Sequence, residues 1–296
     1  MSSVAFTPEK APAGDNRAFK AIAVPIHDLP CDTTALDVAA ELARTQGAHM
    51  HVIQIVALPS PVADTWALMP NPDFTQLCTR IRASASTCAA GAQRKLEASG
   101  VAGEIRSLEA VYTEPADLAA TAARHCDLAV LARPSHARRD GSTVHGYFAA
   151  LLMESARPVM VVPADHPVES FRHVLIAWRE TRECARALRD ALPFLEAAGS
   201  VDLLVVDPKA TPLETADDVG TTAMQFLVAH GIDAHRIAVA SDGRSVGATI
   251  LDEARQRHAD LIVAGGYGHS RFREWAIGGT TRHLFFEATI PVLYSH

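Results

Sequence analysis

Residues 260–296 read DLIVAGGYGHSRFREWAIGGTTRHLFFEATIPVLYSH. The segment begins with an apolar run, Leu261–Ala264, that is long enough for a buried parallel strand, and it ends with a second one, Pro291–Tyr294. Between them lie a glycine-rich loop and a helical stretch, Arg282–Glu287. A strand, a glycine loop and a helix start together present bare backbone N–H groups that can hold an anion. The same pattern also fits an ordinary strand-to-helix loop with structural glycines.

Composition limits the class of protein. The chain has 296 residues, 48% of them hydrophobic, and a formal net charge of −7. It is long enough for two ordinary domains. The negative charge argues against a nucleic-acid or anionic-membrane partner, and no apolar run reaches the roughly 18 residues of a membrane helix.

The cysteines and the first residues bear on the compartment. The five cysteines are scattered and form no CxxC pair. This favours reduced thiols in a cytosol over disulfides or a zinc site, so we expect a cytoplasmic protein without a metal site. Residues 1–17 have proline, glycine and charges where a signal peptide has an apolar core, and we expect a flexible lead-in there.

The chain contains an internal repeat. RHCDLAV at 124–130 matches RHADLIV at 257–263, and the same offset of 133 carries Gly146 onto Gly279. The starts of the two halves also correspond, with an offset of 152. A fixed register of this length predicts two similar domains in tandem.

The two predicted domains cover residues 18–165 and 170–296, with a short polar linker between them. In each, apolar strands alternate with helices, which is typical of a parallel sheet covered on both faces. We expect two separate sheets related by an approximate twofold axis. We also expect Pro193 to kink or break a helix, and Thr33 or Thr34 to cap another.

The fifth predicted strand of each half is short, apolar and at a sheet edge. Because exposed apolar edges tend to be covered, we expect these two strands to pair and to make the chain an internal pseudo-dimer. A further homodimer is left open. The predicted strands are 21–26, 49–56, 104–108, 128–132 and 159–162 in the first half, and 174–178, 202–206, 236–240, 261–264 and 292–294 in the second.

The tandem repeat, the element order and the spacing G-x2-G-x9-G at Gly265, Gly268 and Gly278 together resemble the universal stress protein family in its two-domain form. The resemblance covers nearly the whole chain. It implies an α/β fold with two doubly wound domains, each with a five-stranded parallel sheet in the order 3-2-1-4-5. It also implies ATP or a related adenine nucleotide as a cofactor in some members. Gly279 stands where the family has Ser or Thr, and Thr280 comes one residue late.

The resemblance places the phosphates of a nucleotide in the second half, on residues that share the glycine loop and the helix start: Gly265, Gly268, Gly278, Gly279 and Thr280. We add Trp178, Arg179 and Val206, which end the first two strands of that half. Nucleotide-binding members carry an Asp just after the first strand, where this chain has His27 and Arg179. Arginine cannot accept a hydrogen bond as a carboxylate does, so base recognition is expected to be weak or altered.

The first half is predicted to be degenerate for a nucleotide. Ala132, Ser135 and His145 replace the three spaced glycines, and Arg133 adds a side chain next to Pro134, which has no N–H. The arginines of this loop fit a solvated basic loop better than an anion site.

Three functions fit these observations. The first is a stress-response protein that binds an adenine nucleotide in its C-terminal domain. The second is a dimeric regulatory or interaction module of the same fold that binds no nucleotide. The third, an enzyme such as a slow ATPase, ranks last because no catalytic residue, metal carboxylate pair or general base is recognisable.

Overall fold

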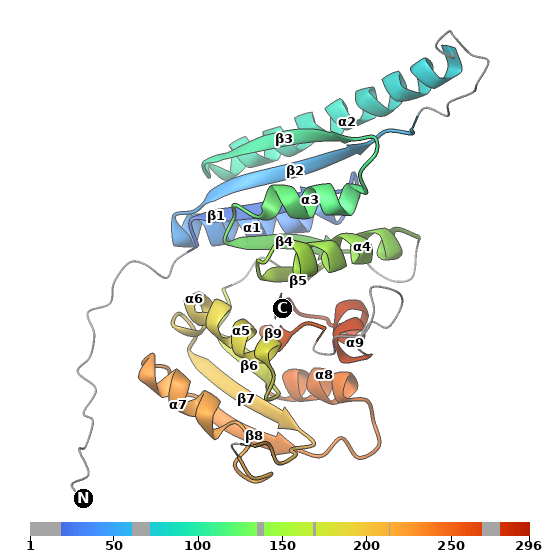
Figure 1. Cartoon of the computed structure of the whole chain (residues 1–296). Helices are drawn as coiled ribbons and strands as arrows, with labels where there is room; N and C mark the ends of the chain where they lie inside the picture. Colours follow the sequence, from blue (N-terminus) through green and yellow to red (C-terminus); the bar gives the residue numbers. More distant parts are fainter. Residues whose placement is uncertain (1–18, 61–71, 135–138, 168–169, 213, 268–278) are drawn as a thin grey trace, which may run out of the picture.

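The computed structural model describes residues 19–60, 72–134, 139–167, 170–212, 214–267 and 279–296, so the predicted lead-in at 1–17 lies outside it. Strands and helices alternate along the chain (Figure 1). The elements of the first half are β1 (Ala21–Ile26), α1 (Asp32–Gln46), β2 (His49–Ala57), α2 (Pro72–Ser99), β3 (Gly103–Ala110), α3 (Pro115–Ala123), β4 (Leu128–Arg133), α4 (Arg139–Glu154) and β5 (Val159–Pro163).

The second half repeats this order. Its elements are β6 (His173–Trp178), α5 (Arg182–Asp190), α6 (Leu192–Leu195), β7 (Ser200–Val206), α7 (Thr221–Ala229), β8 (His235–Val239), α8 (Val246–Gln256), β9 (Leu261–Gly265), α9 (Gly279–Glu287) and β10 (Val292–Ser295). The predicted helix break is confirmed, because α5 ends at Asp190 and α6 begins at Leu192 with Pro193 in its first turn.

All ten strands form one sheet in the order β3-β2-β1-β4-β5-β10-β9-β6-β7-β8. Each half has the predicted order 3-2-1-4-5 with parallel pairs. The predicted pairing of the fifth strands is also confirmed, since β5 and β10 run antiparallel with Val161 opposite Val292 and Val159 opposite Tyr294. The expectation of two separate sheets was wrong, because this edge-to-edge pairing joins them through backbone hydrogen bonds.

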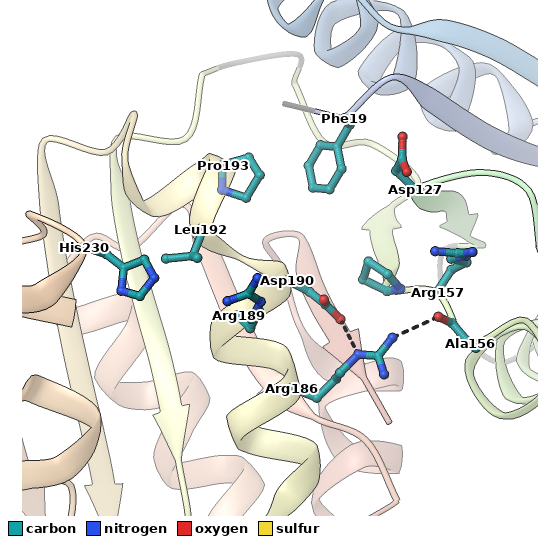
Figure 2. A pocket seen from close by; sticks show the side chains of 11 residues that line it. Phe19, Asp127, Ala156, Arg157, Arg186, Arg189, Asp190, Leu192, Pro193 and His230 are labelled. Carbon is teal, nitrogen blue, oxygen red and sulfur yellow. Dashed lines mark hydrogen bonds and ion pairs between the residues drawn. The ribbon is translucent and has the colours of Figure 1, made fainter. Parts of the chain in front are cut away.

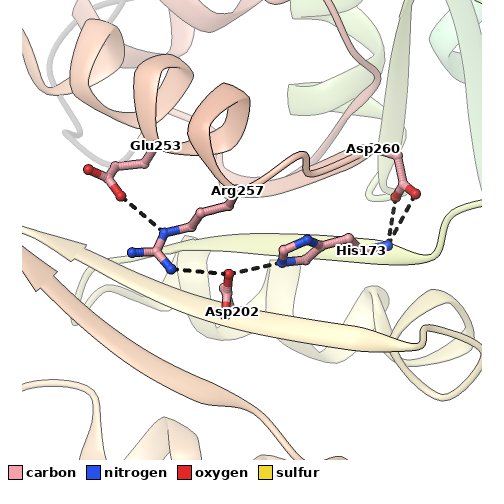
Figure 3. Close-up of polar contacts among 5 residues, drawn as sticks. All are labelled: His173, Asp202, Glu253, Arg257 and Asp260. Atoms are coloured by element: carbon pink, nitrogen blue, oxygen red, sulfur yellow. Dashed lines mark hydrogen bonds and ion pairs between the residues drawn. The ribbon is translucent and has the colours of Figure 1, made fainter.

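The repeat is visible in a matched pair of aspartates. The Asp127 carboxylate accepts the backbone N–H groups of Lys20 at 2.7 Å and Ala21 at 3.0 Å. In the second half, Asp260 accepts the N–H of Arg172 at 2.7 Å and that of His173 at 3.0 Å (Figure 3). The donors of the two contacts are related by the offset of 152, and the acceptors by the offset of 133. In both halves the contact therefore joins the start of the first strand to the start of the fourth.

The starting edge of β6 and β7 carries a network of charges (Figure 3). Asp202 is 5% exposed, and its carboxylate lies 2.9 Å from Nε2 of His173 and 3.7 Å from the guanidinium of Arg257. Glu253 contacts the other side of Arg257 at 3.0 Å. The buried carboxylate thus has two basic neighbours, which offsets the cost of burying its charge.

One predicted helix start was wrong. Neither Thr33 nor Thr34 caps α1, which begins at Asp32. The Asp32 carboxylate accepts the N–H groups of His27 at 2.7 Å and Leu29 at 3.0 Å and so folds the preceding turn onto the helix start. Thr34 lies inside the helix, and its hydroxyl donates to the carbonyl of Ala164.

The seam between the halves is packed with aromatic side chains. Phe148 of α4 lies with its ring centroid 4.9 Å from that of Phe285 in α9 and 4.9 Å from that of Tyr294 in β10. All three side chains are fully buried. The two halves therefore share one hydrophobic core across the β5–β10 seam. Among the described helices, none is long and apolar enough to cross a membrane.

Candidate functional site

The predicted site residues of the second half lie at one edge of the sheet. In the strand registers, Trp178 is opposite Val205, and Ala177 is opposite Ala264. Arg179, Val206 and Gly265 therefore all lie where parallel strands end, which is where ligands bind in sheets of this kind. The structure thus brings together the ends of β6, β7 and β9.

The first two glycines of the loop are needed for close packing. A Cβ on Gly265 would lie 2.7 Å from the backbone nitrogen of Cys184, in the first turn of α5. A Cβ on Gly266 would lie 2.4 Å from Cδ2 of Leu152, which belongs to α4 of the first half. The N–H of Gly266 is also occupied, since it donates to Ser295 O at 2.8 Å. These two glycines bring α5 and α4 close to the loop.

The start of α9 is fastened to the end of β9. Tyr267 has a φ of +54°, and its N–H donates to Oγ1 of Thr281 at 3.3 Å. Thr281 is 5% exposed, and sequence reasoning missed this role because it looked one residue earlier, at Thr280. Gly268 and Gly278 lie outside the described residues.

Gly279 and Thr280 form the first turn of α9, directly after the loop. Backbone N–H groups in the first turn of a helix have no acceptor within that helix, so they are available to an anion. Gly279 is exposed, and an added Cβ would meet no described atom within 4 Å. Unlike Gly265 and Gly266, Gly279 is therefore not required by packing against any described residue.

Trp178 forms the inner side of this edge. It is 7% exposed and belongs to the core, with Cδ1 at 3.5 Å from the position of a Cβ on Gly220. Its Nε1–H is buried and has no hydrogen-bond partner among the described residues. A buried donor of this kind costs about 1–3 kcal/mol unless a water or ligand satisfies it.

Two carboxylates lie near Arg179. Arg179 is exposed, and its side chain makes no hydrogen bond or ion pair with the described residues. Partial burial, followed by the charge of Glu214, raises the pKa of the neighbouring Glu180. The second carboxylate is engaged, because Glu214 accepts the N–H groups of Gly220 at 2.9 Å and Thr222 at 2.7 Å. Glu180 thus keeps a carboxylate with free acceptor positions beside Arg179.

Glu214 was missed by sequence reasoning. It is 9% exposed and holds the start of α7 through those two backbone hydrogen bonds. Burial acts to raise its pKa, but the bonds from Thr222 and Gly220 outweigh that effect and hold the pKa below its usual range. The Glu214 N–H donates to Oγ1 of Thr211 at 3.0 Å, but α7 begins only at Thr221, so the pattern Thr211-x-x-Glu214 does not act as a capping box and gives no local signal of this role.

The chain was compared with known proteins. A family model described as the universal stress protein family matches it twice, over residues 18–163 and 170–296. The chain belongs to the universal stress protein family. No curated protein matches it.

Several solved structures share the fold over nearly the whole chain. One from Archaeoglobus fulgidus DSM 4304 is 18% identical, with a TM-score of 0.71, over 93% of this chain and 95% of that one. A functionally unknown protein from Pseudomonas aeruginosa PAO1 is 14% identical, with a TM-score of 0.58, over 94% and 93%. A putative universal stress protein from Pseudomonas aeruginosa UCBPP-PA14 is 13% identical, with a TM-score of 0.57, over 94% of each. At these identities the likeness concerns the fold.

The first universal stress protein unit has filled the equivalent edge with its own side chains. The His27 side chain is 3% exposed, its Nδ1 lies 3.3 Å from Oδ1 of Asp32, and its ring meets that of Tyr147 edge-on at 4.3 Å between centroids. Arg133 is 8% exposed, and its guanidinium donates to Ala288 O in the second unit at 2.6 Å. The prediction of a solvated basic loop was therefore wrong for Arg133, because β5–β10 pairing places the second unit directly over it.

Neither unit shows a candidate metal centre among its described residues, where no three His, Cys, Asp or Glu side chains are grouped to hold an ion.

Proposed function

We propose that the second unit, residues 170–296, binds ATP or a related adenine nucleotide, and that the protein acts in a stress response through this binding. The observation that carries the proposal is the contrast between the described residues of the two carboxyl edges: the first has buried side chains at His27 and Arg133, while the second has an exposed Gly279 and an Arg179 without a described partner. Family membership supports the same assignment.

Each part of the edge has a distinct role in this proposal. The phosphates lie against Gly265, Gly268, Gly278 and the first turn of α9 at Gly279 and Thr280, where the N–H groups and the helix dipole favour negative charge.

The base and sugar lie over the ends of β6 and β7. Trp178 and Val206 form the apolar floor beneath the base, and Arg179 stacks on the purine or contacts a phosphate. Glu180 supplies the carboxylate that the ribose hydroxyls need, one residue after the position where the family has Asp. Because Arg179 stands where the family has Asp, recognition of the base is expected to be weak or altered. We therefore expect ADP to bind about as well as ATP.

A second candidate function is a regulatory or interaction module that binds no nucleotide. The N–H groups of Gly266 and Tyr267 are already bonded to Ser295 and Thr281, and this favours a loop built for structure. Calorimetry with ATP and ADP separates the two functions.

Two substitutions test the site in opposite directions. Gly268→Val is expected to abolish binding, because the side chain blocks the loop, whereas Ser135→Val at the equivalent place of the first unit has no effect. Gly279→Ser restores the hydroxyl that the family has at this place, and we expect about tenfold tighter binding from one added hydrogen bond to a charged group. Gly146→Ser is the matched control. Gly146 is the repeat equivalent of Gly279, and an added Cβ there would also meet no described atom within 4 Å. Equal affinities in all four variants and the wild type would refute a nucleotide site in this loop.

A further inference from the structure

A cleft lies between the two units (Figure 2). Its volume is about 310 Å³, at the lower end of the range for small-molecule sites. The first unit contributes Phe19 and Arg157 to its lining, and the second contributes Arg186 and Arg189 of α5 and Pro193 of α6. The cleft therefore exists only where the two units meet.

The cleft is rich in unused hydrogen-bond donors. The Arg189 side chain is exposed and makes no hydrogen bond or ion pair with the described residues. Arg186 uses Nε on Asp190 at 3.2 Å and Nη2 on Ala156 O at 3.1 Å, which leaves Nη1 (Figure 2). Arg157 uses Nε on Arg124 O at 3.0 Å, which leaves its two terminal nitrogens. Three guanidinium groups that line the cleft thus keep N–H donors that no described residue accepts.

The two carboxylates of the cleft are already engaged. Asp127 accepts the backbone N–H groups of Lys20 and Ala21, and Asp190 accepts from Arg186. They neutralise part of the positive charge but leave more arginines than acids in the lining. An anion with several acceptor oxygens is the ligand that satisfies such a donor set, and the planar guanidinium matches phosphate in geometry.

One wall of the cleft is apolar. Phe19, Leu192 and Pro193 contribute apolar surface to the lining, and the Phe19 ring packs against that of Phe194 at 5.3 Å between centroids. We propose that this cleft binds a small phosphate monoester, with the phosphate held by Arg157, Arg186 and Arg189 and the organic group against the apolar wall. Because both units contribute arginines, the ligand stabilises their junction, and the melting temperature rises with its concentration.

The test uses phenyl phosphate and inorganic phosphate as probes on the full chain, by calorimetry and thermal melting at fixed ionic strength, because salt screens exposed charges. Phenyl phosphate is expected to bind more tightly than inorganic phosphate, since only the ester reaches the apolar wall. Inorganic phosphate binding as tightly as phenyl phosphate would overturn the assignment of a monoester.

Variants locate the site. The single variants Arg189→Gln and Arg157→Gln are each expected to weaken phenyl phosphate binding about tenfold or more. This is the usual loss when a hydrogen bond to a charged group is removed. Arg189 has no described partner, so its loss leaves the fold intact, and the melting temperature without ligand checks this. Arg94→Gln removes an equally exposed charge from α2 and is expected to bind like the wild type.

Three results contradict the proposal. Unchanged binding in Arg189→Gln excludes the cleft. An equal loss in Arg94→Gln shows that only the net charge matters. A loss in Gly268→Val, with none in the cleft variants, places the phosphate in the glycine loop instead.

Discussion

Positions 133 and 266 are equivalent in the repeat, yet the first is arginine and the second is glycine. Arg133 reaches across the seam to Ala288 O. At Gly266 the missing side chain leaves space, and Leu152 of the first unit fills it. The backbone repeat is symmetric, but the side chains that face each other across the seam are not. The two units have diverged where each packs against the other.

The residue after the first strand shows the same divergence. His27 is buried against Asp32 and Tyr147, whereas its equivalent, Arg179, is exposed and without a described partner. The described side chains of the first unit cover its carboxyl edge, although Nε2 of His27 is buried without a described hydrogen-bond partner, whereas the second edge keeps an exposed cation at Arg179. This difference is the reason why we place the proposed nucleotide site at the second edge.

The largest expected effect comes from Gly265. Its equivalent in the first unit is Ala132, but at Gly265 itself a Cβ would press on the backbone of Cys184, which no side-chain rotation relieves. Gly265→Ala is expected to lower the free energy of unfolding by about 3 kcal/mol, as measured by urea denaturation. Gly279→Ala is the control, because an added Cβ there would meet no described atom within 4 Å, and it is expected to change stability by no more than about 0.5 kcal/mol. Equal losses in the two variants would mean that α5 does not pack this closely.

A slightly smaller effect is expected at Gly266. Gly266→Ala should cost about 2 kcal/mol because its Cβ overlaps Cδ2 of Leu152. In a Leu152→Val background, that cost is expected to fall by about half, since the shorter side chain gives way. Strict additivity in this double-mutant cycle would show that the two residues do not meet.

Arg133→Met probes the other side of the same comparison. The substitution keeps most of the apolar stem but leaves Ala288 O without its 2.6 Å hydrogen bond. We expect a loss of about 1.5 kcal/mol in unfolding free energy. Arg94→Met on α2 serves as the exposed control. An equal loss of unfolding free energy in that variant would show that the hydrogen bond across the seam does not account for the effect at Arg133.

The smallest effect is a pH dependence from His145, the first-unit equivalent of Gly278. Burial, and then the charge of Arg282, lowers the pKa of His145, whose ring lies 4.8 Å from that of Phe285 between centroids. The native state therefore favours the neutral ring. As pH falls through the ordinary value of 6.5, the unfolded chain binds the proton first, so stability present above this pH is lost below it.

We expect the melting temperature of the wild type to fall between pH 7.5 and pH 5.5 by more than that of His145→Phe. The other histidines are common to both proteins, so the difference between the two curves isolates His145. Parallel curves would mean that the imidazole accepts a proton in the native state as readily as in the unfolded one.

The sequence by itself determined the architecture of each unit. The apolar runs and their periodicity predicted the strands, and Pro193 predicted the break between α5 and α6. The register of the repeat predicted that Asp127 and Asp260 occupy equivalent places. These features depend on neighbours in the chain or on the repeat itself, so local patterns report them. The glycine spacing also indicates that the second unit keeps a loop fit for an anion, and this stays a prediction, because Gly268 and Gly278 lie outside the described residues.

Only the tertiary structure decided what those glycines and charges touch. It showed that Gly265 and Gly266 are fixed by Cys184 and Leu152, that Arg133 is buried, and that the two sheets are one. It also brought Arg157 of the first unit and Arg189 of the second into the lining of one cleft. Each of these contacts joins residues far apart in the chain. Antiparallel pairing of β5 with β10 sets which surfaces meet, and no local pattern records that geometry.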